Sequence, residues 1–110
     1  MNEMRVLVTF AVENEFAPWR GMRDFRRTAS ASPSLYQAQF DSVDVAVVLT
    51  GIGAHHARRA MQLALPDGAD FCISSGLAGA LQLRHRIGEV VVARAVRSAE
   101  IGRASCRERV

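Results

Sequence analysis

The sequence contains no lysine, and all 14 of its basic residues are arginine. This absence excludes the lysine of a P-loop and a catalytic Schiff-base lysine. The two cysteines, Cys72 and Cys106, are too few for a disulfide framework, and no metal-ligand spacing surrounds either. No apolar run approaches the ~18 residues of a membrane span, and the N-terminus lacks the apolar region of a signal peptide. We therefore expect a soluble, cytoplasmic protein with no metal, no cofactor and no membrane partner, in which Cys72 is a small core residue.

The positive charge is too small to indicate a nucleic-acid partner by itself. The formal net charge is +3, so binding to RNA would need a clustered basic face. Arg20, Arg23, Arg26 and Arg27 come closest to such a cluster. The solvated face of a helix explains the same spacing, and we favour that interpretation. A basic RNA-binding fragment is the weakest of the functional alternatives.

The last eleven residues, 100–110, differ from the rest of the chain. They read EIGRASCRERV and show no period typical of a strand or a helix. The stretch resembles the in-frame translation of a common sequencing adapter, and such additions are excluded from fold reasoning. We therefore expect residues 1–99 to be the natural part of the chain and residues 100–110 to be a non-native tail.

Residues 1–99 alternate between strand and helix patterns, which is typical of an α/β fold. A helix should begin near residues 15–17, because Pro18 is tolerated only in a first turn, and it should bury Phe16, Trp19, Met22 and Phe25. The strands are apolar throughout, as in sheets covered on both faces. We predict a layered fold with a mixed, largely parallel sheet flanked by helices. The other expected elements are strands at 5–10, 35–40, 43–49, 71–74 and 88–96, a tight turn at 41–42, a loop at 30–34 and a helix at 54–65.

Three segments rich in small or polar residues directly follow predicted strands, at 10–15, 50–53 and 74–80. Ligands of such sheets bind at the carboxyl ends of the strands, so these segments should form one crevice. The glycines of the second segment expose amides at a helix start, which suits an anionic or hydroxyl-rich ligand, although a strand-to-helix turn needs glycine in any case. His55 and His56 are adjacent and point in different directions, so we interpret them as ordinary helix-start residues.

Four motifs, in this order and spacing, resemble those of the nucleoside phosphorylase superfamily (the purine/uridine phosphorylase type), and most closely those of its methylthioadenosine/S-adenosylhomocysteine nucleosidases. The motifs are FAVENEF, LTGIG, SSGLAGAL and IGEVVVA. The resemblance implies that Glu15 orients and activates the attacking water, and that Ile52 lines the pocket for the 5′ substituent. It places Gly76, Ala78 and Gly79 in the loop beside the base and ribose. It also implies an enzyme that cleaves the N-glycosidic bond of a purine nucleoside and is a homo-oligomer at full length.

The departures from the family pattern favour hydrolysis over phosphorolysis, with phosphate still a possible partner. Leu77 stands where the family often has serine, and Ala80 replaces a glycine. Without the resemblance, Glu15 would be a solvent-facing acid in the first turn of a helix. The family's later half carries a Glu-Met-Glu stretch and an aspartate with no counterpart here, so we expect an inactive N-terminal part whose strand at 88–96 lacks a neighbour. The alternative is a non-catalytic α/β module that binds a nucleoside.

Overall fold

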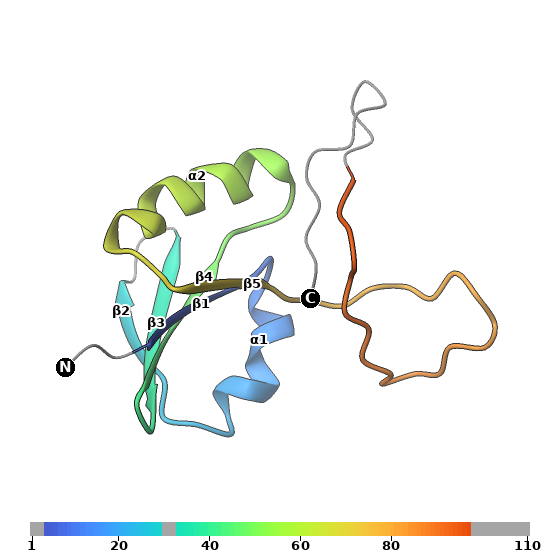
Figure 1. The fold of residues 1–110 in the computed structure, drawn as a ribbon, viewed down its shortest axis with the longest axis horizontal. Coiled ribbons are helices and arrows are strands. Elements are labelled where there is room, and N and C mark those ends of the chain that lie inside the picture. Colours follow the sequence, from blue (N-terminus) through green and yellow to red (C-terminus); the bar gives the residue numbers. More distant parts are fainter. Residues whose placement is uncertain (1–3, 30–32, 98–110) are drawn as a thin grey trace. The chain divides into compact units, whose positions relative to one another are not determined.

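A computed structural model describes residues 4–29 and 33–97 of the chain. Residues 30–32 of the expected loop and the expected tail at 100–110, with Cys106, lie outside these ranges. From Met4 to Ser74 the described chain forms a five-stranded sheet and two α-helices (Figure 1). Their bounds are β1 Met4–Phe10, α1 Glu13–Arg20, β2 Arg26–Ala29, β3 Ser34–Phe40, β4 Val43–Leu49, α2 Ala54–Ala64, the short 3₁₀ helix η1 Leu65–Asp67, and β5 Phe71–Ser74.

The strand order in the sheet is β2-β3-β4-β1-β5. Strand β1 lies between β4 and β5 and runs parallel to both. Strands β3 and β4 form an antiparallel hairpin, in which Asp41 adopts a φ of 54° at the tight turn, and β2 pairs antiparallel with β3. The predicted α/β fold with a mixed sheet flanked by helices is confirmed.

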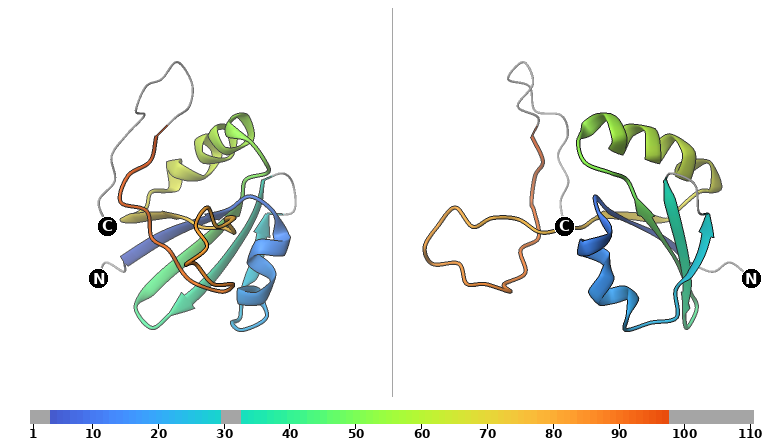
Figure 2. Two further views of the ribbon diagram at one scale, coloured as in Figure 1. Left: turned by 90° about the vertical axis from the view of Figure 1, so that its right-hand side faces the viewer. Right: turned by 180° about the vertical axis from the view of Figure 1, so that it is seen from behind.

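Each face of the sheet is covered by one helix, as the two views in Figure 2 show. Side chains alternate along β1, so Val8 faces the cluster around α1 and Leu7 faces the cluster around α2. On the α1 side the core is aromatic, with Phe16 fully buried at its centre. On the α2 side, Ala60 and Ala64 pack against the sheet, because small side chains let the helix approach closely.

Helix α1 begins at Glu13, earlier than predicted, and contains Pro18 in its interior. Pro18 lacks an N–H and so forfeits one helical hydrogen bond. The burial of Phe16 and the acidic first turn stabilise the helix despite that loss. The helix also ends at Arg20, so the predicted apolar face is only partly correct. Phe25 lies outside the helix but still contacts Phe16, with ring centroids 5.0 Å apart, whereas Met22 is 73% exposed.

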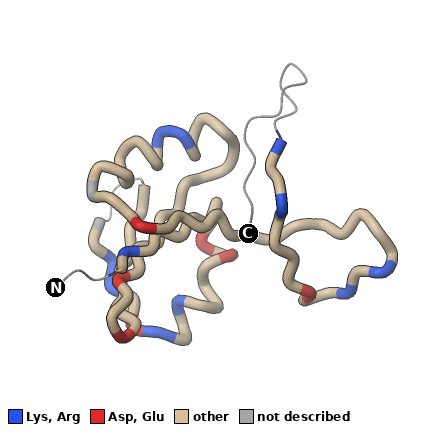
Figure 3. The backbone as a smooth tube through the Cα atoms, viewed as in Figure 1, with Lys and Arg blue, Asp and Glu red and all other residues tan. Residues whose placement is uncertain are grey.

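The arginines that the sequence placed on one helix face belong to different elements. Arg20 ends α1, whereas Arg26 and Arg27 lie in β2, a strand that the sequence did not indicate. Arg20 forms an ion pair with Glu13, and its guanidinium lies 4.7 Å from the centroid of the Tyr36 ring. Basic and acidic residues are interspersed along the described chain (Figure 3). The interpretation of these arginines as one solvated helix face is therefore wrong.

Two apolar segments predicted to be buried strands are exposed. Strand β5 exists, and among the described strands it pairs with β1 alone, at the edge of the sheet. Its Phe71 and Ile73 side chains are 57% and 50% exposed. Cys72 in the same strand is exposed too, so its prediction as a core residue is wrong. Residues 88–96 form no continuous strand, only a single bridge at Val96. An extended apolar segment forms a stable ladder only with a partner strand alongside it.

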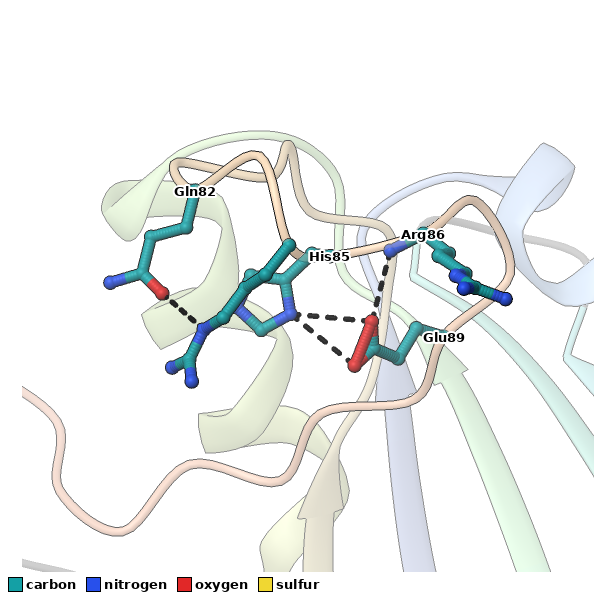
Figure 4. A network of polar contacts seen from close by, with 5 residues as sticks. Gln82, His85, Arg86 and Glu89 are labelled. Carbon is teal, nitrogen blue, oxygen red and sulfur yellow. Dashed lines mark hydrogen bonds and ion pairs between the residues drawn. The ribbon is translucent and has the colours of Figure 1, made fainter.

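A second unit begins at Gly79 and is described to residue 97. Its turns are held by polar contacts within the unit (Figure 4). The Glu89 carboxylate accepts a 3.0 Å hydrogen bond from the Arg86 N–H and lies 3.3 Å from the His85 ring, while the Arg84 guanidinium donates to Gln82. Across both units, no described helix has the length and apolar character needed to cross a membrane.

Candidate active site

The carboxyl ends of β4, β1 and β5 lie side by side, and backbone hydrogen bonds continue beyond each strand. The Thr50 N–H donates to the Phe10 carbonyl and the Gly51 N–H to the Ala11 carbonyl, each at 2.8 Å. On the other side of β1, the Ser75 N–H donates to the Thr9 carbonyl, also at 2.8 Å. The turns that follow the three strands are thus fixed against one another at one edge of the sheet.

These three turns border a cleft of about 630 Å³. A volume of this size suits a small-molecule ligand. The crevice that the sequence predicted at the strand ends is therefore present. Its lining comes from the first turn (Ala11, Glu15), the second turn and α2 (Thr50, Gly51, Gly53, Ala54, Ala57, Met61), and β1, β5 and the third turn (Thr9, Cys72, Ser74, Ser75, Gly76, Leu77).

The Glu15 carboxylate joins two of these turns. Its Oε1 atom accepts hydrogen bonds from the Ala11 N–H at 3.0 Å and the Val12 N–H at 3.4 Å. A glutamate in the first turn that reaches back in this way caps the helix start. Its Oε2 atom accepts a third hydrogen bond, at 3.0 Å, from the Leu77 N–H, 62 residues away. Helix capping explains the first two contacts but not the third, which links the carboxylate to the turn that follows β5.

The hydrogen bonds also set the charge of Glu15. The Leu77 N–H has the largest effect and lowers the pKa of the Glu15 carboxyl below its usual value of 4.5. Burial has the second-largest effect and opposes this lowering, and the Ala11 and Val12 N–H groups add to it. Hydrogen bonds donated to a carboxylate favour its ionised form. Glu15 is therefore an anion at neutral pH and faces the cleft in that form.

This lowered pKa predicts a pH-dependent contribution to stability. A carboxyl whose pKa is lower in the folded than in the unfolded chain stabilises the fold above about pH 4.5, and that contribution is lost as the pH falls through the folded-state pKa. We expect the urea midpoint of the wild-type chain to exceed that of Glu15→Gln at about pH 7, and the difference to shrink on acidification to about pH 3. A difference that is constant with pH would contradict this.

The turn between β4 and α2 depends on its glycines. Gly51 and Gly53 have φ values of 88° and 94°, in the region that favours glycine. A Cβ atom at Gly51 would also approach the Cβ of His56 to 3.2 Å. The Nδ1 atom of His56 lies 2.9 Å from the Ile52 carbonyl oxygen, so this histidine supports the turn as an ordinary helix-start residue.

The structure brings only some of the predicted site residues to the cleft. Glu15 and Gly76 line it, together with the two glycines on either side of Ile52. The Ile52 side chain itself is 74% exposed and is not among the lining groups. Ala78 ends the first unit, and Gly79 belongs to the second. In the described part of the chain, no three His, Cys, Asp or Glu side chains gather in a way that would hold a metal ion.

Sequence reasoning missed the Leu77 backbone N–H as a partner of Glu15. The sequence drew attention to Leu77 only through its side chain, at a position where the family often has serine. The contact depends on a backbone atom from a distant turn, and no local pattern predicts such a pairing. The contact between Glu15 and Leu77 follows from the pairing of β1 with β5, which brings the turns after these two strands together.

The arrangement defines an α/β protein with a small-molecule cleft at the carboxyl ends of its parallel strands. The family described as the phosphorylase superfamily matches residues 5–108, and the chain belongs to this superfamily. The similarity extends to solved structures of nucleosidases.

The 5′-methylthioadenosine/S-adenosylhomocysteine nucleosidase of Colwellia psychrerythraea, in complex with adenine, is 27% identical with a TM-score of 0.74, covering 91% of this chain and 42% of that one. The corresponding Neisseria meningitidis enzyme, in complex with methylthio-immucillin-A, is 26% identical with a TM-score of 0.67. The match covers 77% of this chain and 38% of that one. The S-adenosylhomocysteine nucleosidase of Streptococcus pyogenes, at 22% identity and a TM-score of 0.68 over 81% and 39%, shares the fold. The chain spans about two fifths of the length of these relatives.

Proposed function

We propose that this chain is part of an enzyme that cleaves the N-glycosidic bond of a purine nucleoside, with Glu15 as the catalytic carboxylate. The observation that carries the proposal is the position of the Glu15 carboxylate, which faces the cleft and bonds to amides of two different turns. Membership of the phosphorylase superfamily supports it. So do the ligands of the similar nucleosidases, adenine and methylthio-immucillin-A, which indicate a purine nucleoside as the substrate.

The chemistry assigns Glu15 two tasks. Cleavage of an N-glycosidic bond passes through a sugar with oxocarbenium character, as in glycoside hydrolysis. An ionised carboxylate beside that sugar stabilises its positive charge, and the lowered pKa of Glu15 keeps it ionised. The same oxygens orient an attacking water and accept its proton as the new bond to carbon forms. A low pKa makes Glu15 a weak base, so we assign the larger share of its effect to charge stabilisation and orientation.

We propose water rather than phosphate as the nucleophile. The Leu77 N–H points to Glu15 and is occupied by its carboxylate, so this amide is not available to an anionic ligand. A phosphate at the same place would also meet the negative charge of Glu15. The Leu77 side chain borders the cleft and offers no hydrogen-bond donor.

The other predicted binding residues keep their proposed places around the substrate. Ile52 lies in the turn before α2, and its exposed side chain is available to an apolar 5′ substituent. Ala78 and Gly79 remain proposed neighbours of the base and ribose. For Gly76, the contact with Glu15 suggests a more specific role, argued below.

The 110-residue chain alone should not release free base from a nucleoside. It spans about two fifths of the similar nucleosidases, and we propose that the groups that bind the ribose and protonate the base are not among its residues. Incubation with 5′-methylthioadenosine followed by chromatography should yield no adenine above the background without protein. Adenine formed by the purified chain, and abolished by Glu15→Gln, would overturn this expectation.

A hybrid protein tests the proposed activity itself. Residues 5–97 would replace the matching segment of the Colwellia psychrerythraea nucleosidase, whose structure this chain overlays with a TM-score of 0.74. We expect the hybrid to release adenine from 5′-methylthioadenosine. A folded hybrid that binds the nucleoside without cleaving it would instead support the alternative, a non-catalytic binding module.

A further inference from the structure

Gly76 is the glycine of the third turn that borders the cleft, and a side chain there would collide with Glu15. A Cβ atom built at Gly76 would lie 2.8 Å from Oε2 of Glu15, 3.3 Å from Cδ and 3.4 Å from Oε1. The first of these distances is too short for any real contact between such atoms. The carboxylate therefore occupies the space that any other residue at position 76 would fill.

Backbone conformation does not explain this glycine. Gly51, Gly53, Gly68 and Gly88 have φ values between 82° and 94°, which other residues adopt only with strain. Gly76 is not among the residues with positive φ, so that reason for a glycine does not apply at position 76. Position 76 needs a glycine because the carboxylate of Glu15, a residue of another turn, lies where a side chain would be.

We propose that Gly76 is a positioning residue for Glu15: the missing side chain lets the carboxylate lie against the third turn and accept the Leu77 N–H. The catalytic meaning of this role rests on the proposed function, but the contact itself does not. Gly76, which the resemblance placed beside the base and ribose, is thereby assigned a contact with the Glu15 carboxylate at the cleft.

The physical consequence of a methyl group at position 76 is local. The atoms it would strike are the far end of a flexible side chain, which moves more easily than backbone. Glu15 would swing away and lose its bond to Leu77, while Oε1 keeps its bonds to the start of α1. We therefore expect Gly76→Ala to fold with Glu15 displaced.

The test is an NMR titration of the 110-residue chain, wild type and Gly76→Ala, that follows the Glu15 side-chain carboxyl carbon and the Leu77 amide proton. In the wild type both signals should titrate together, because they share a hydrogen bond. In Gly76→Ala the Leu77 amide should stop following the carboxyl, and the Glu15 pKa should rise towards 4.5, since its largest lowering contact is lost. A Leu77 amide that still follows Glu15, with an unchanged pKa, would overturn the proposal.

Gly21→Ala is the matched control. Gly21 follows α1, has an ordinary φ of −73°, and a Cβ there would meet only backbone oxygens at 3.7 and 3.8 Å. Both Glu15 and Leu77 should titrate in Gly21→Ala as in the wild type. A shift of the same size in both variants would mean that any added methyl group perturbs the site, and it would also contradict the proposal.

A double-mutant cycle covers the case in which Gly76→Ala folds poorly. The variants are Gly76→Ala and Glu15→Ala, alone and together, compared by urea unfolding. If Gly76→Ala acts through the carboxylate, its destabilisation should disappear once Glu15 is truncated. An equal loss of stability in both backgrounds would assign the glycine to the turn alone and refute its role in positioning Glu15.

The hybrid adds a catalytic measurement. We expect Gly76→Ala to lower kcat about 10- to 100-fold, since a displacement of about 1 Å at a catalytic group has effects of this order, with KM little changed. A rise in KM at constant kcat would contradict the positioning role. A hybrid that is inactive even with Gly76 in place would defeat the proposed function and leave the titration result standing.

Discussion

In the hybrid enzyme, replacing Glu15 with glutamine should lower the rate of adenine release about 10²- to 10³-fold, the usual loss when one group that stabilises the charge of the transition state is removed. The amide has nearly the size of the carboxylate but no charge, so it can neither accept a proton from water nor stabilise a cationic sugar. The glutamine amide also presents either its NH₂ group or a weaker oxygen acceptor to the Leu77 N–H. In the wild type the carboxylate oxygen accepts this hydrogen bond at 3.0 Å. The measurement is the rate of adenine release under saturating nucleoside, with circular dichroism to confirm the fold.

Glu13→Gln is the matched control for this experiment. Glu13 lies in the same first turn of α1, but it is exposed and pairs with Arg20 instead of facing the cleft. Exposed ion pairs contribute little to stability, so this variant should keep its rate within about twofold. If Glu13→Gln and Glu15→Gln lowered the rate of adenine release equally, the negative charge at the start of α1 would matter and the position of Glu15 would not. Full activity in Glu15→Gln would remove it from the mechanism.

Truncating Phe16 to alanine should destabilise the 110-residue chain by about 3–5 kcal/mol. The ring is fully buried, and its centroid lies 5.0–5.5 Å from those of Phe10, Phe25 and Tyr36. The loss combines the transfer of the ring to water with the cavity left among these aromatic neighbours. A change of this size is a large part of the 5–15 kcal/mol that stabilises most domains. Urea unfolding followed by the fluorescence of Trp19 measures it directly.

Phe71→Ala deletes the same side chain from an exposed position and so serves as the control. Phe71 is 57% exposed in β5, and its removal leaves no closed cavity. We expect a loss below about 1 kcal/mol, within the range of strand propensity. Comparable losses in the two variants would mean that the aromatic cluster around α1 does not carry the stability that its burial indicates.

The elements that the sequence predicted well are those whose pattern is local. The apolar run of β1, the β3–β4 hairpin with its turn at Asp41, and the helix after Gly53 each carry their signal within about a dozen residues. From these elements the order of strands and helices follows, and with it the crevice at the carboxyl ends of the strands. That part of the candidate site was therefore accessible from the sequence.

The remaining features depend on neighbours that a local pattern does not contain. Strand β2 reads RRTA and forms because β3 lies beside it. The apolar sequences of β5 and of residues 88–96 predicted burial, but burial needs a covering element on each side. The contact between Glu15 and Leu77 joins two turns that are distant in sequence, so its discovery required the fold. The local pattern alone predicted Glu15 to be a solvent-facing acid in the first turn of a helix.

The place of β1 between β4 and β5 has a consequence for the order in which the molecule assembles. Among the described strands, β1 comes earliest in the chain and pairs with β4 and β5, which come later, so both pairings close long stretches of chain. Closure of long stretches is slow compared with formation of the β3–β4 hairpin, which joins neighbouring segments. Pulse-labelling hydrogen exchange should find the amides of the hairpin protected before those of β1. The edge of the sheet that borders the cleft depends on the pairing of β1 with both β4 and β5, so it would be the last part of the sheet to form.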